Sequence, residues 1–253
     1  MTTYREGKSY IKNGDCLQLM KEVQTGSVDM ILCDLPYGTT RNKWDVKIDM
    51  VALWAEYERI IKDHGAIVLF AQVPFNIALG ASNRRLLRYE WVWVKEQGTG
   101  FLNAKRAPLK IHENILVFYK HLPTYCPQFT QGKPYETKRK GNNGSNYGKG
   151  KGCVTKSTGT RYPVDVLHFV RDTPRLHPTQ KPVKLCEYLI KTYTNEGDTV
   201  LDNCMGSGTS CVAAANLGRH YIGMELEREY YEIAKNRLKE AAAKREETWE
   251  SCK

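Results

Sequence analysis

A carboxylate, a proline and an aromatic ring stand together in Asp34-Leu35-Pro36-Tyr37, directly after the apolar run 28–33. This combination suits an exposed nucleobase amine, because the amino hydrogens need acceptors and the flat ring needs an aromatic face. Asp34 and the Leu35 carbonyl would each accept one hydrogen, Pro36 would stiffen the turn and Tyr37 would stack on the base. A strand that simply ends in a turn fits the same residues, so the tetrapeptide needs support from a second motif.

The second motif is the glycine-containing segment 202–210, which follows the apolar run 199–201 and precedes a helix-like stretch. A strand, a glycine turn and a helix start present backbone N–H groups to a ligand. Another apolar run ends in Glu225, and an acidic residue about 20 positions after Asp202 is what a ribose diol requires. Because Cys211 stands where a dinucleotide site has its third glycine, a mononucleoside ligand is favoured over NAD.

Three motifs in this order resemble the beta class of S-adenosylmethionine-dependent DNA amino-methyltransferases. They are the DLPY tetrapeptide, the string HPTQKP at 177–182, and the segment 202–210 followed by Glu225. The resemblance extends from about Gly14 to Leu238 and implies a flipped-out base in double-stranded DNA, with S-adenosylmethionine as cofactor. Two departures from the family pattern are Leu35, in place of the first proline of DPPY, and Asn203-Cys204, in place of Pro-Phe.

The resemblance also implies which residues bind the cofactor. Asp15 and Cys16 would contact its adenine, Glu225 its ribose, and the string 177–182 would border its methionine end. A strand-ending turn at Gly14 and a helix start at Pro182 are the structural alternatives for two of these places. The full set of expected cofactor residues is Asp15, Cys16, Thr179, Gln180, Lys181, Asp202, Cys204, Gly206, Ser207, Gly208, Thr209 and Glu225.

The expected reaction is methylation of adenine N6. An exocyclic amine is a poor nucleophile, and two acceptors at Asp34 and the Leu35 carbonyl would stabilise charge developing on its nitrogen. In the family an acidic first residue of the tetrapeptide tends to accompany adenine, and serine tends to accompany cytosine N4. Cytosine N4 methylation, RNA adenine methylation and a catalytically decayed DNA-binding accessory protein stay open as alternatives, the last favoured only by Leu35 and Asn203-Cys204.

Basic residues gather in a segment rich in Gly, Lys, Asn, Ser and Thr, from Pro127 to Pro163. Such a long loop is more often functional or disordered than structural, and by resemblance it would recognise the target sequence. Lys and Arg would neutralise phosphates, whereas each lysine taken singly fits a solvated loop equally well. The residues expected to bind DNA are Lys105, Arg106 and Lys110 in an earlier loop, and Lys138, Arg139, Lys140, Lys149 and Lys151 in this segment.

Composition limits the remaining possibilities. A chain of 253 residues with 41% hydrophobic content and a net charge of +10 suits one large domain with a nucleic-acid partner. No stretch is apolar enough for a membrane span, so a cytoplasmic, nucleoid-associated protein is expected, and a homodimer is one expected state. The eight cysteines include no Cys-x-x-Cys pair, which argues against a metal site and for reduced thiols.

Alternating strand and helix patterns predict an α/β fold with a doubly wound, mostly parallel, seven-stranded sheet and, in the run 90–119, an antiparallel edge strand. The resemblance implies that this is a Rossmann-like methyltransferase sheet. Residues 1–120 would form its catalytic half, 121–175 an inserted target-recognition region, and 176–253 the cofactor-binding half. The expected strands are 10–11, 28–33, 66–70, 90–94, 115–119, 199–201 and 221–224, and the expected helices are 50–62, 75–82, 183–193, 210–217 and 228–243.

Overall fold

The computed structural model describes the chain except for residues 1, 39–47, 142–151, 175, 177–179 and 252–253. It contains two compact units. The first combines Met1–Cys126 with Asp165–Lys253, and the second is Pro127–Val164. The second unit lies within the insertion expected at 121–175, and its role in target recognition stays a prediction.

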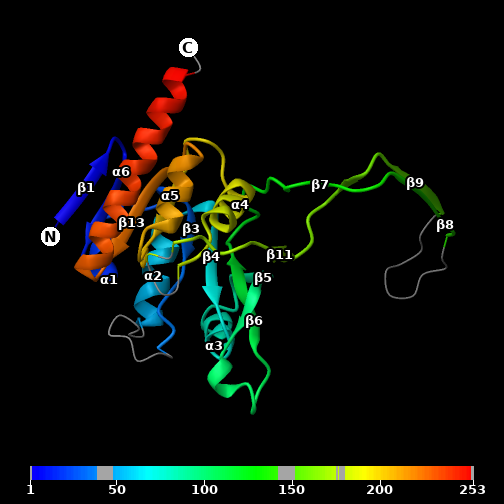
Figure 1. Ribbon diagram of the computed structural model, residues 1–253, viewed down its shortest axis with the longest axis horizontal. Coiled ribbons are helices and arrows are strands. Elements are labelled where there is room, and N and C mark those ends of the chain that lie inside the picture. Colours follow the sequence, from blue (N-terminus) through cyan, green and yellow to red (C-terminus); the bar gives the residue numbers. More distant parts are fainter. Residues whose placement is uncertain (1, 39–47, 142–151, 175, 177–179, 252–253) are drawn as a thin grey trace. The chain divides into compact units, whose positions relative to one another are not determined.

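A nine-stranded sheet in the order β1-β2-β13-β12-β3-β4-β6-β5-β11 forms the centre of the first unit (Figure 1). Its strands are β1 (Thr2–Glu6), β2 (Ser9–Asn13), β3 (Val28–Cys33), β4 (Ile61–Ala71), β5 (Leu87–Thr99), β6 (Lys110–Phe118), β11 (Val166–His168), β12 (Thr199–Asp202) and β13 (His220–Glu225). The strands β2, β13, β12, β3 and β4 are parallel to one another. The sheet is therefore mostly parallel, and the predicted α/β class is confirmed.

The seven predicted strands form the interior of this sheet, and one further strand is added at each edge. β1 pairs antiparallel with β2, and β11 pairs parallel with β5. The antiparallel strand expected at the edge is β6, which instead lies between β4 and β5 and is antiparallel to both. It is internal because β5 pairs with the side of β6 that β4 leaves open, and β11 then adds a strand beyond β5.

Helices cover both faces of the sheet. α1 (Cys16–Met20), α2 (Met50–Ile60) and α3 (Phe75–Ser82) pack on one face, and α4 (Val183–Tyr193), α5 (Thr209–Asn216) and α6 (Arg228–Ser251) pack on the other. β3 shows the origin of the two cores, because successive side chains of a strand point to opposite faces. Met30 and Leu32 join the core under α4 to α6, whereas Ile31 and Cys33 join the core under α1 to α3.

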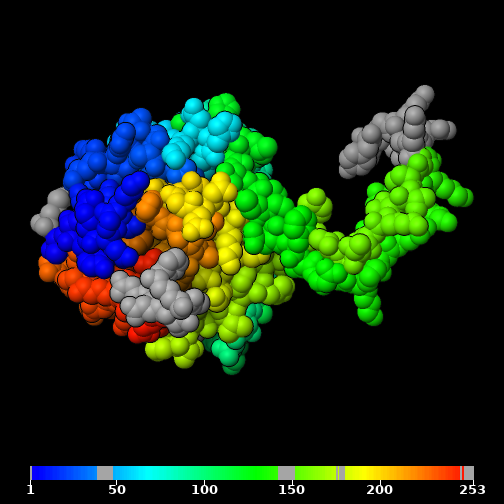
Figure 2. Space-filling view, turned by 90° about the horizontal axis from the view of Figure 1, so that it is seen from above, coloured from blue at the N-terminus to red at the C-terminus, as the bar shows by residue number. Residues whose placement is uncertain are grey.

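The first unit thus unites segments that are far apart in the sequence. On its surface the N-terminal strands (blue) adjoin residues of the cofactor half (orange and red) (Figure 2). Each of the five predicted helices is present, and α6 continues to Ser251, beyond the expected end at 243. Over the described residues, no helix has both the length and the apolarity that a membrane span requires.

The second unit contains short antiparallel ladders, which the sequence analysis did not predict for this segment. β7 (Thr130–Gln131) pairs with β10 (Thr160–Arg161), and β8 (Tyr135–Arg139) pairs with β9 (Cys153–Ser157). β-Branched and aromatic residues favour these strands despite the many Gly and Lys residues around them. The Arg161 guanidinium lies 4.5 Å from the centre of the Tyr135 ring and ties the two ladders together.

Candidate active site

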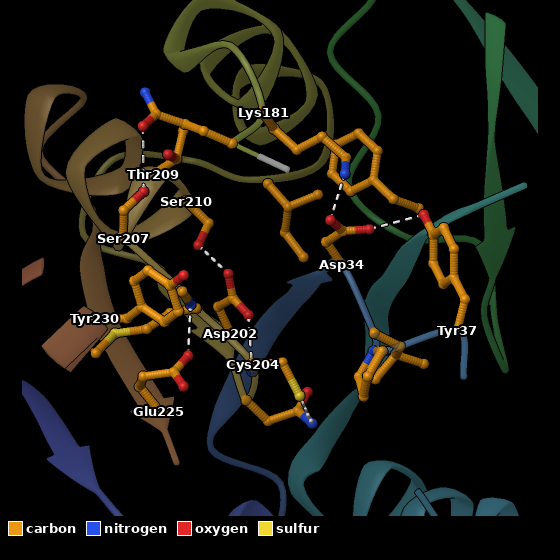
Figure 3. A pocket seen from close by; sticks show the side chains of 18 of the residues that line it. Asp34, Tyr37, Lys181, Asp202, Cys204, Ser207, Thr209, Ser210, Glu225 and Tyr230 are labelled. Carbon is orange, nitrogen blue, oxygen red and sulfur yellow. Dashed lines mark hydrogen bonds and ion pairs between the residues drawn. The ribbon is translucent and has the colours of Figure 1, made fainter. Parts of the chain in front are cut away.

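A pocket of about 550 Å³ opens at the carboxyl ends of the parallel strands (Figure 3). Asp34 follows β3, Asp202 ends β12 and Glu225 ends β13, so parallel pairing brings three carboxylates to one edge of the sheet. This edge is where open α/β sheets bind their ligands. The predicted residues that line the pocket are Asp15, Cys16, Asp34, Leu35, Pro36, Tyr37, Gln180, Lys181, Asp202, Cys204, Gly206, Ser207, Thr209 and Glu225.

The Asp34 carboxylate is held by two donors. The Tyr37 hydroxyl donates to Asp34 Oδ1 at 2.8 Å, and the Lys181 ammonium pairs with Oδ2. The Tyr37 ring stacks on Phe75 with centroids 4.8 Å apart and planes 23° apart. Burial raises the pKa of Asp34, although the Lys181 ammonium acts in the opposite direction. The side chain is still 22% exposed, so a ligand in the pocket can reach it.

Leu35, the first departure from the family pattern, is a core residue in this structure. Its side chain is 3% exposed and packs in the cluster on the α1 to α3 face. Burial of an apolar side chain fixes the turn in a different way from the ring of a proline. The Leu35 backbone can therefore be positioned without the proline of the family motif.

Lys181 lies at the catalytic end of the pocket. The sequence interpretation placed it beside the methionine end of the cofactor, but its ammonium pairs with Asp34 and is 3.4 Å from Glu113 Oε2. Glu113 Oε1 pairs in turn with Lys95 at 2.5 Å. Burial would raise the pKa of Glu113, yet the two ammonium groups outweigh it and lower that pKa. Sequence reasoning missed Lys95 and Glu113, because strands β5 and β6 carry no motif that marks them.

The glycine segment forms a tight turn whose start is fixed by Asp202. The Cys204 N–H donates to Asp202 Oδ1 at 3.0 Å, and the Ser210 hydroxyl donates to Oδ2. Burial raises the pKa of Asp202 to about 6. Gly206 and Gly208 have φ angles of +52° and +77°, which glycine adopts readily. Asp202 thus links the end of β12 to the first turn of α5.

Helix α6 closes the other side of this turn. A Cβ at Gly208 would lie 2.8 Å from Ala234 Cβ, so only glycine lets α6 approach this closely. Arg237 donates to the Ser207 carbonyl at 2.7 Å and to Thr209 Oγ1 at 3.1 Å. Sequence reasoning missed Arg237, which lies in an otherwise ordinary amphipathic stretch of the helix. Gly208 supports the pocket by this packing and does not line it.

Glu225 is oriented by backbone donors on both of its oxygens. The Gly206 N–H donates to Oε2 and the Glu227 N–H to Oε1, each at 2.8 Å. Each carboxylate oxygen retains a second lone pair, so the group can still accept from a ribose diol. Burial raises the pKa of Glu225 to about 6. The Gly14 N–H donates to the Glu225 carbonyl at 2.9 Å and brings the end of β2 to the same site.

Asp15 and Cys16 follow this contact at the start of α1. The Asp15 carboxylate accepts from the Gln18 N–H at 3.0 Å, which makes it the N-cap of the helix. Asp15 therefore has a structural role as a helix cap, and both residues also line the pocket. At the opposite rim Gln180 Oε1 accepts from the Leu176 N–H at 3.0 Å and from the Ser207 hydroxyl at 3.4 Å. Thr179 lies outside the described residues.

The second departure, Asn203-Cys204, has its own buried support. Asn203 is 1% exposed, and its Oδ1 accepts a hydrogen bond from the Tyr57 hydroxyl at 2.5 Å. Its amide also donates to Cys204 Sγ at 3.5 Å. A buried polar side chain is tolerated when its partners are supplied, and Tyr57 of α2 supplies one here. In place of Pro-Phe, Asn203 is therefore buried and hydrogen-bonded, and Cys204 lines the pocket.

The residues expected to bind DNA lie in two exposed places. Lys105, Arg106 and Lys110 belong to the hairpin between β5 and β6, next to the short 3₁₀ turn Phe101–Asn103. Lys138, Arg139 and Lys140 are exposed in the second unit, and Lys149 and Lys151 lie outside the described residues. Each described residue of this set is available to a partner. The described His, Cys, Asp and Glu residues form no cluster suited to a metal ion.

Comparisons with known proteins agree with the site. A family model described as DNA methylase matches residues 28–236. The chain is 28% identical over 240 residues to the type II methyltransferase M.HpaI of Haemophilus parainfluenzae, covering 88% of this chain and 72% of that protein. It is 28% identical over 247 residues to the DNA adenine methyltransferase YhdJ of Escherichia coli (strain K12), covering 92% and 83%.

Solved structures share the fold. The M1.HpyAVI complex with S-adenosylmethionine has a TM-score of 0.62 at 24% identity, over 90% of this chain and 98% of that chain. The cytosine-N4-specific PvuII DNA methyltransferase has a TM-score of 0.67 at 14% identity, over 90% and 85%. With the family model spanning both motifs, the chain belongs to the DNA methylase family and is an S-adenosylmethionine-dependent DNA amino-methyltransferase of the adenine N6 and cytosine N4 class.

Proposed function

We propose that the chain methylates N6 of an adenine that has been rotated out of double-stranded DNA. The observation that carries this proposal is the Asp34 carboxylate, oriented by Tyr37 in the same pocket as the glycine turn. Among the relatives, YhdJ is named a DNA adenine methyltransferase. An acidic first residue of the tetrapeptide is also the form that accompanies adenine in this family.

The chain's own groups account for activation of the amine. Asp34 and the Leu35 carbonyl accept the two amino hydrogens, and this favours a more tetrahedral nitrogen whose lone pair can attack. Tyr37 holds the base by stacking, an interaction worth roughly 1–3 kcal/mol per base. Because Phe75 covers one face of the Tyr37 ring, the base uses the other face. Release of the amine proton follows methyl transfer, so Asp34 need not be a strong base.

The pocket fits S-adenosylmethionine, which supplies an electrophilic methyl group on a sulfonium. Glu225 has oriented lone pairs for a ribose diol, and the turn after Asp202 presents the start of α5. Asp15 and Cys16 would border the adenine of the cofactor. Gln180, already bonded to Ser207, would meet the methionine end. These polar groups come from four separate parts of the chain and line one cavity.

The exposed basic residues would bind the DNA backbone. Lys105, Arg106 and Lys110 belong to a hairpin whose base contributes Thr99 and Lys95 to the pocket wall, which supports a role next to the target base. The second unit would recognise the target sequence through its basic hairpin, β8 and β9. A homodimer and association with the nucleoid complete the proposal.

Nucleoside analysis of methylated DNA tests this function. The purified chain would be incubated with isotope-labelled S-adenosylmethionine and mixed-sequence duplex DNA, and digested nucleosides would be identified by mass spectrometry. Label in N6-methyladenine is the expected result, and label in N4-methylcytosine would replace adenine by the runner-up base. Methylation of an RNA of the same sequence in preference to DNA would change the substrate class. Cofactor binding without any methylation would indicate an accessory protein.

A further inference from the structure

Four charged side chains form a buried row at the catalytic end of the pocket. Lys95, Glu113 and Lys181 are 5%, 12% and 8% exposed, and Asp34 ends the row. Lys95 pairs with Glu113 Oε1, and the Lys181 ammonium lies between Glu113 Oε2 and Asp34 Oδ2. Two cations and two anions make the row neutral. The cost of burying these four charges is therefore offset as long as each charge keeps a partner.

This arrangement opposes the proposed reaction while Lys181 stays on Asp34. The Asp34 carboxylate already receives hydrogens from Tyr37 and Lys181, so an incoming amine competes with an ammonium for it. The amine nitrogen also becomes positive during transfer, and a like charge at Asp34 would raise the energy of that state. Productive binding of the base therefore requires the ammonium to move.

Glu113 offers the place to which it can move. Its Oε2 is buried and accepts no hydrogen bond from the residues that the structure describes, although it lies 3.4 Å from Lys181 Nζ. A buried carboxylate oxygen without a donor is costly, and a small shift of the ammonium would satisfy it. The Phe70 ring, 5.1 Å from Nζ, forms an apolar wall beside this short path.

We propose that Glu113 is a positioning residue that takes over the Lys181 ammonium when the target base enters and thereby releases Asp34 for the amine. This role rests on the proposed methyl transfer at the same site and deepens it. No bond to a heavy atom is made or broken by the shift. After the shift Glu113 pairs with both ammonium groups, and Asp34 accepts hydrogens from the Tyr37 hydroxyl and the substrate amine in place of the Lys181 ammonium.

A double-mutant cycle in single-turnover methyl transfer tests the role. Glu113→Gln keeps the size of the side chain but holds an ammonium less well, so we expect transfer to slow by roughly 10- to 100-fold. Affinity for S-adenosylmethionine, measured by calorimetry, should be unchanged. In a Lys181→Met background no ammonium has to move, so adding Glu113→Gln should then change the rate by less than about threefold. Glu90→Gln, an exposed glutamate on β5, is the matched control.

An equal loss of rate from Glu113→Gln in both backgrounds would overturn the proposal, because Glu113 would then act without Lys181. If Glu113→Gln alone does not fold, the comparison of Lys181→Met with the double variant still decides, since the double variant keeps one cation, Lys95, and one anion, Asp34, and the row stays neutral. If the wild-type chain methylates no base, the proposed function is wrong, and the role of Glu113 is wrong with it. The wild-type assay shows this before any variant is made.

Discussion

Asp34 meets the Tyr37 hydroxyl on one oxygen and the Lys181 ammonium on the other, so its orientation is set before any ligand arrives. The Tyr37 contact would keep this orientation after the ammonium moves to Glu113, so the carboxylate is preorganised for the charge that develops on the amine. Tyr37 consequently has two roles, since the residue that would stack on the base also orients the carboxylate that would accept its hydrogen.

Asp34→Asn should remove most of the turnover and leave both ligands bound. The amide keeps the size of the carboxylate but loses its charge and one acceptor, a loss that typically costs about 100- to 1000-fold in rate. Single-turnover transfer of labelled methyl groups measures the effect, and Asp63→Asn, an exposed carboxylate 3.7 Å from Lys120, is the control. Transfer by Asp34→Asn at the wild-type rate would reduce Asp34 to the end of a strand.

Cofactor affinity should depend on pH through Glu225. Its pKa is raised to about 6 by burial, so the carboxylate is ionised above that pH and protonated below it. Because the ionised form accepts from the ribose more strongly, affinity should fall as the pH is lowered from about 7 to about 5. Calorimetry at several pH values measures the slope.

Glu225→Gln is the matching variant for this pH dependence. It keeps an acceptor for only one of the two backbone donors and does not titrate, so its cofactor affinity should be weaker by about 1.5–3 kcal/mol at pH 7 and should vary less with pH. Thermal unfolding without ligand measures how much stability is lost with the contact to the Gly206 or Glu227 N–H group. An unchanged pH slope in the variant would assign the titration to another group, such as Asp202.

The residues recognised from sequence are those whose chemistry is local. Asp34 to Tyr37, and the turn from Asp202 to Thr209, are contiguous, and each reaches the pocket from the end of one strand. Glu113, Arg237 and Tyr57 act through partners that are tens to hundreds of positions away, so only the folded chain shows them.

At the scale of elements, the approach of α6 to the glycine turn connects packing with ligand binding. Gly208→Ala would add a methyl group 2.8 Å from Ala234 Cβ at a φ of +77°. We expect a loss of unfolding free energy from both backbone strain and overpacking, about 2–5 kcal/mol together. Weaker cofactor binding should accompany it, because Ser207 and Thr209 are displaced with the turn.

Gly197→Ala separates the two contributions to this loss. Gly197 has a similar φ of +83°, and an added Cβ would meet nothing within 4 Å. The Gly197→Ala variant should lose about 1–2 kcal/mol of unfolding free energy, from backbone strain alone, and should retain its cofactor affinity. Urea unfolding and calorimetry on both variants provide the comparison. Equal losses in the two variants would show that the contact with α6 contributes nothing.

Elements with a continuous apolar pattern were predictable, and short or polar ones were not. β3 and β4 are buried on both faces and therefore appear as apolar runs. β1 alternates half-buried with exposed positions and has no apolar run, while β11 has three residues and depends on pairing with distant β5. The ladders of the second unit were missed because their Gly- and Lys-rich composition is also that of a loop.

At the scale of the whole molecule, a net charge of +10 coexists with a pocket lined by carboxylates. Exposed lysines and arginines would attract the DNA backbone at long range, and the pocket would accept only a single base with its amine. Affinity and chemistry would thus reside in different residues. The salt dependence of DNA binding can separate the two contributions.

Replacing Lys138, Arg139 and Lys140 together with Ala should weaken DNA binding and leave cofactor affinity intact. All three are exposed at the end of β8 or directly after it. Each phosphate contact that is lost should reduce the slope of log affinity against log salt by roughly 0.9, because fewer counterions are released on binding. Fluorescence anisotropy with labelled duplex DNA from low to moderate salt measures this slope.

A second triple variant with the same loss of charge is the control for general electrostatic attraction. Lys8, Lys191 and Lys239 are exposed in the first unit, and their replacement with Ala lowers the net charge equally. If general attraction alone operates, both triple variants should weaken binding and reduce the slope to the same extent. If the second unit contacts phosphates, the Lys138, Arg139 and Lys140 variant should show the larger reduction in slope. Identical slopes in the two variants would assign those residues to a solvated surface and remove the support for target recognition by the β8 and β9 hairpin.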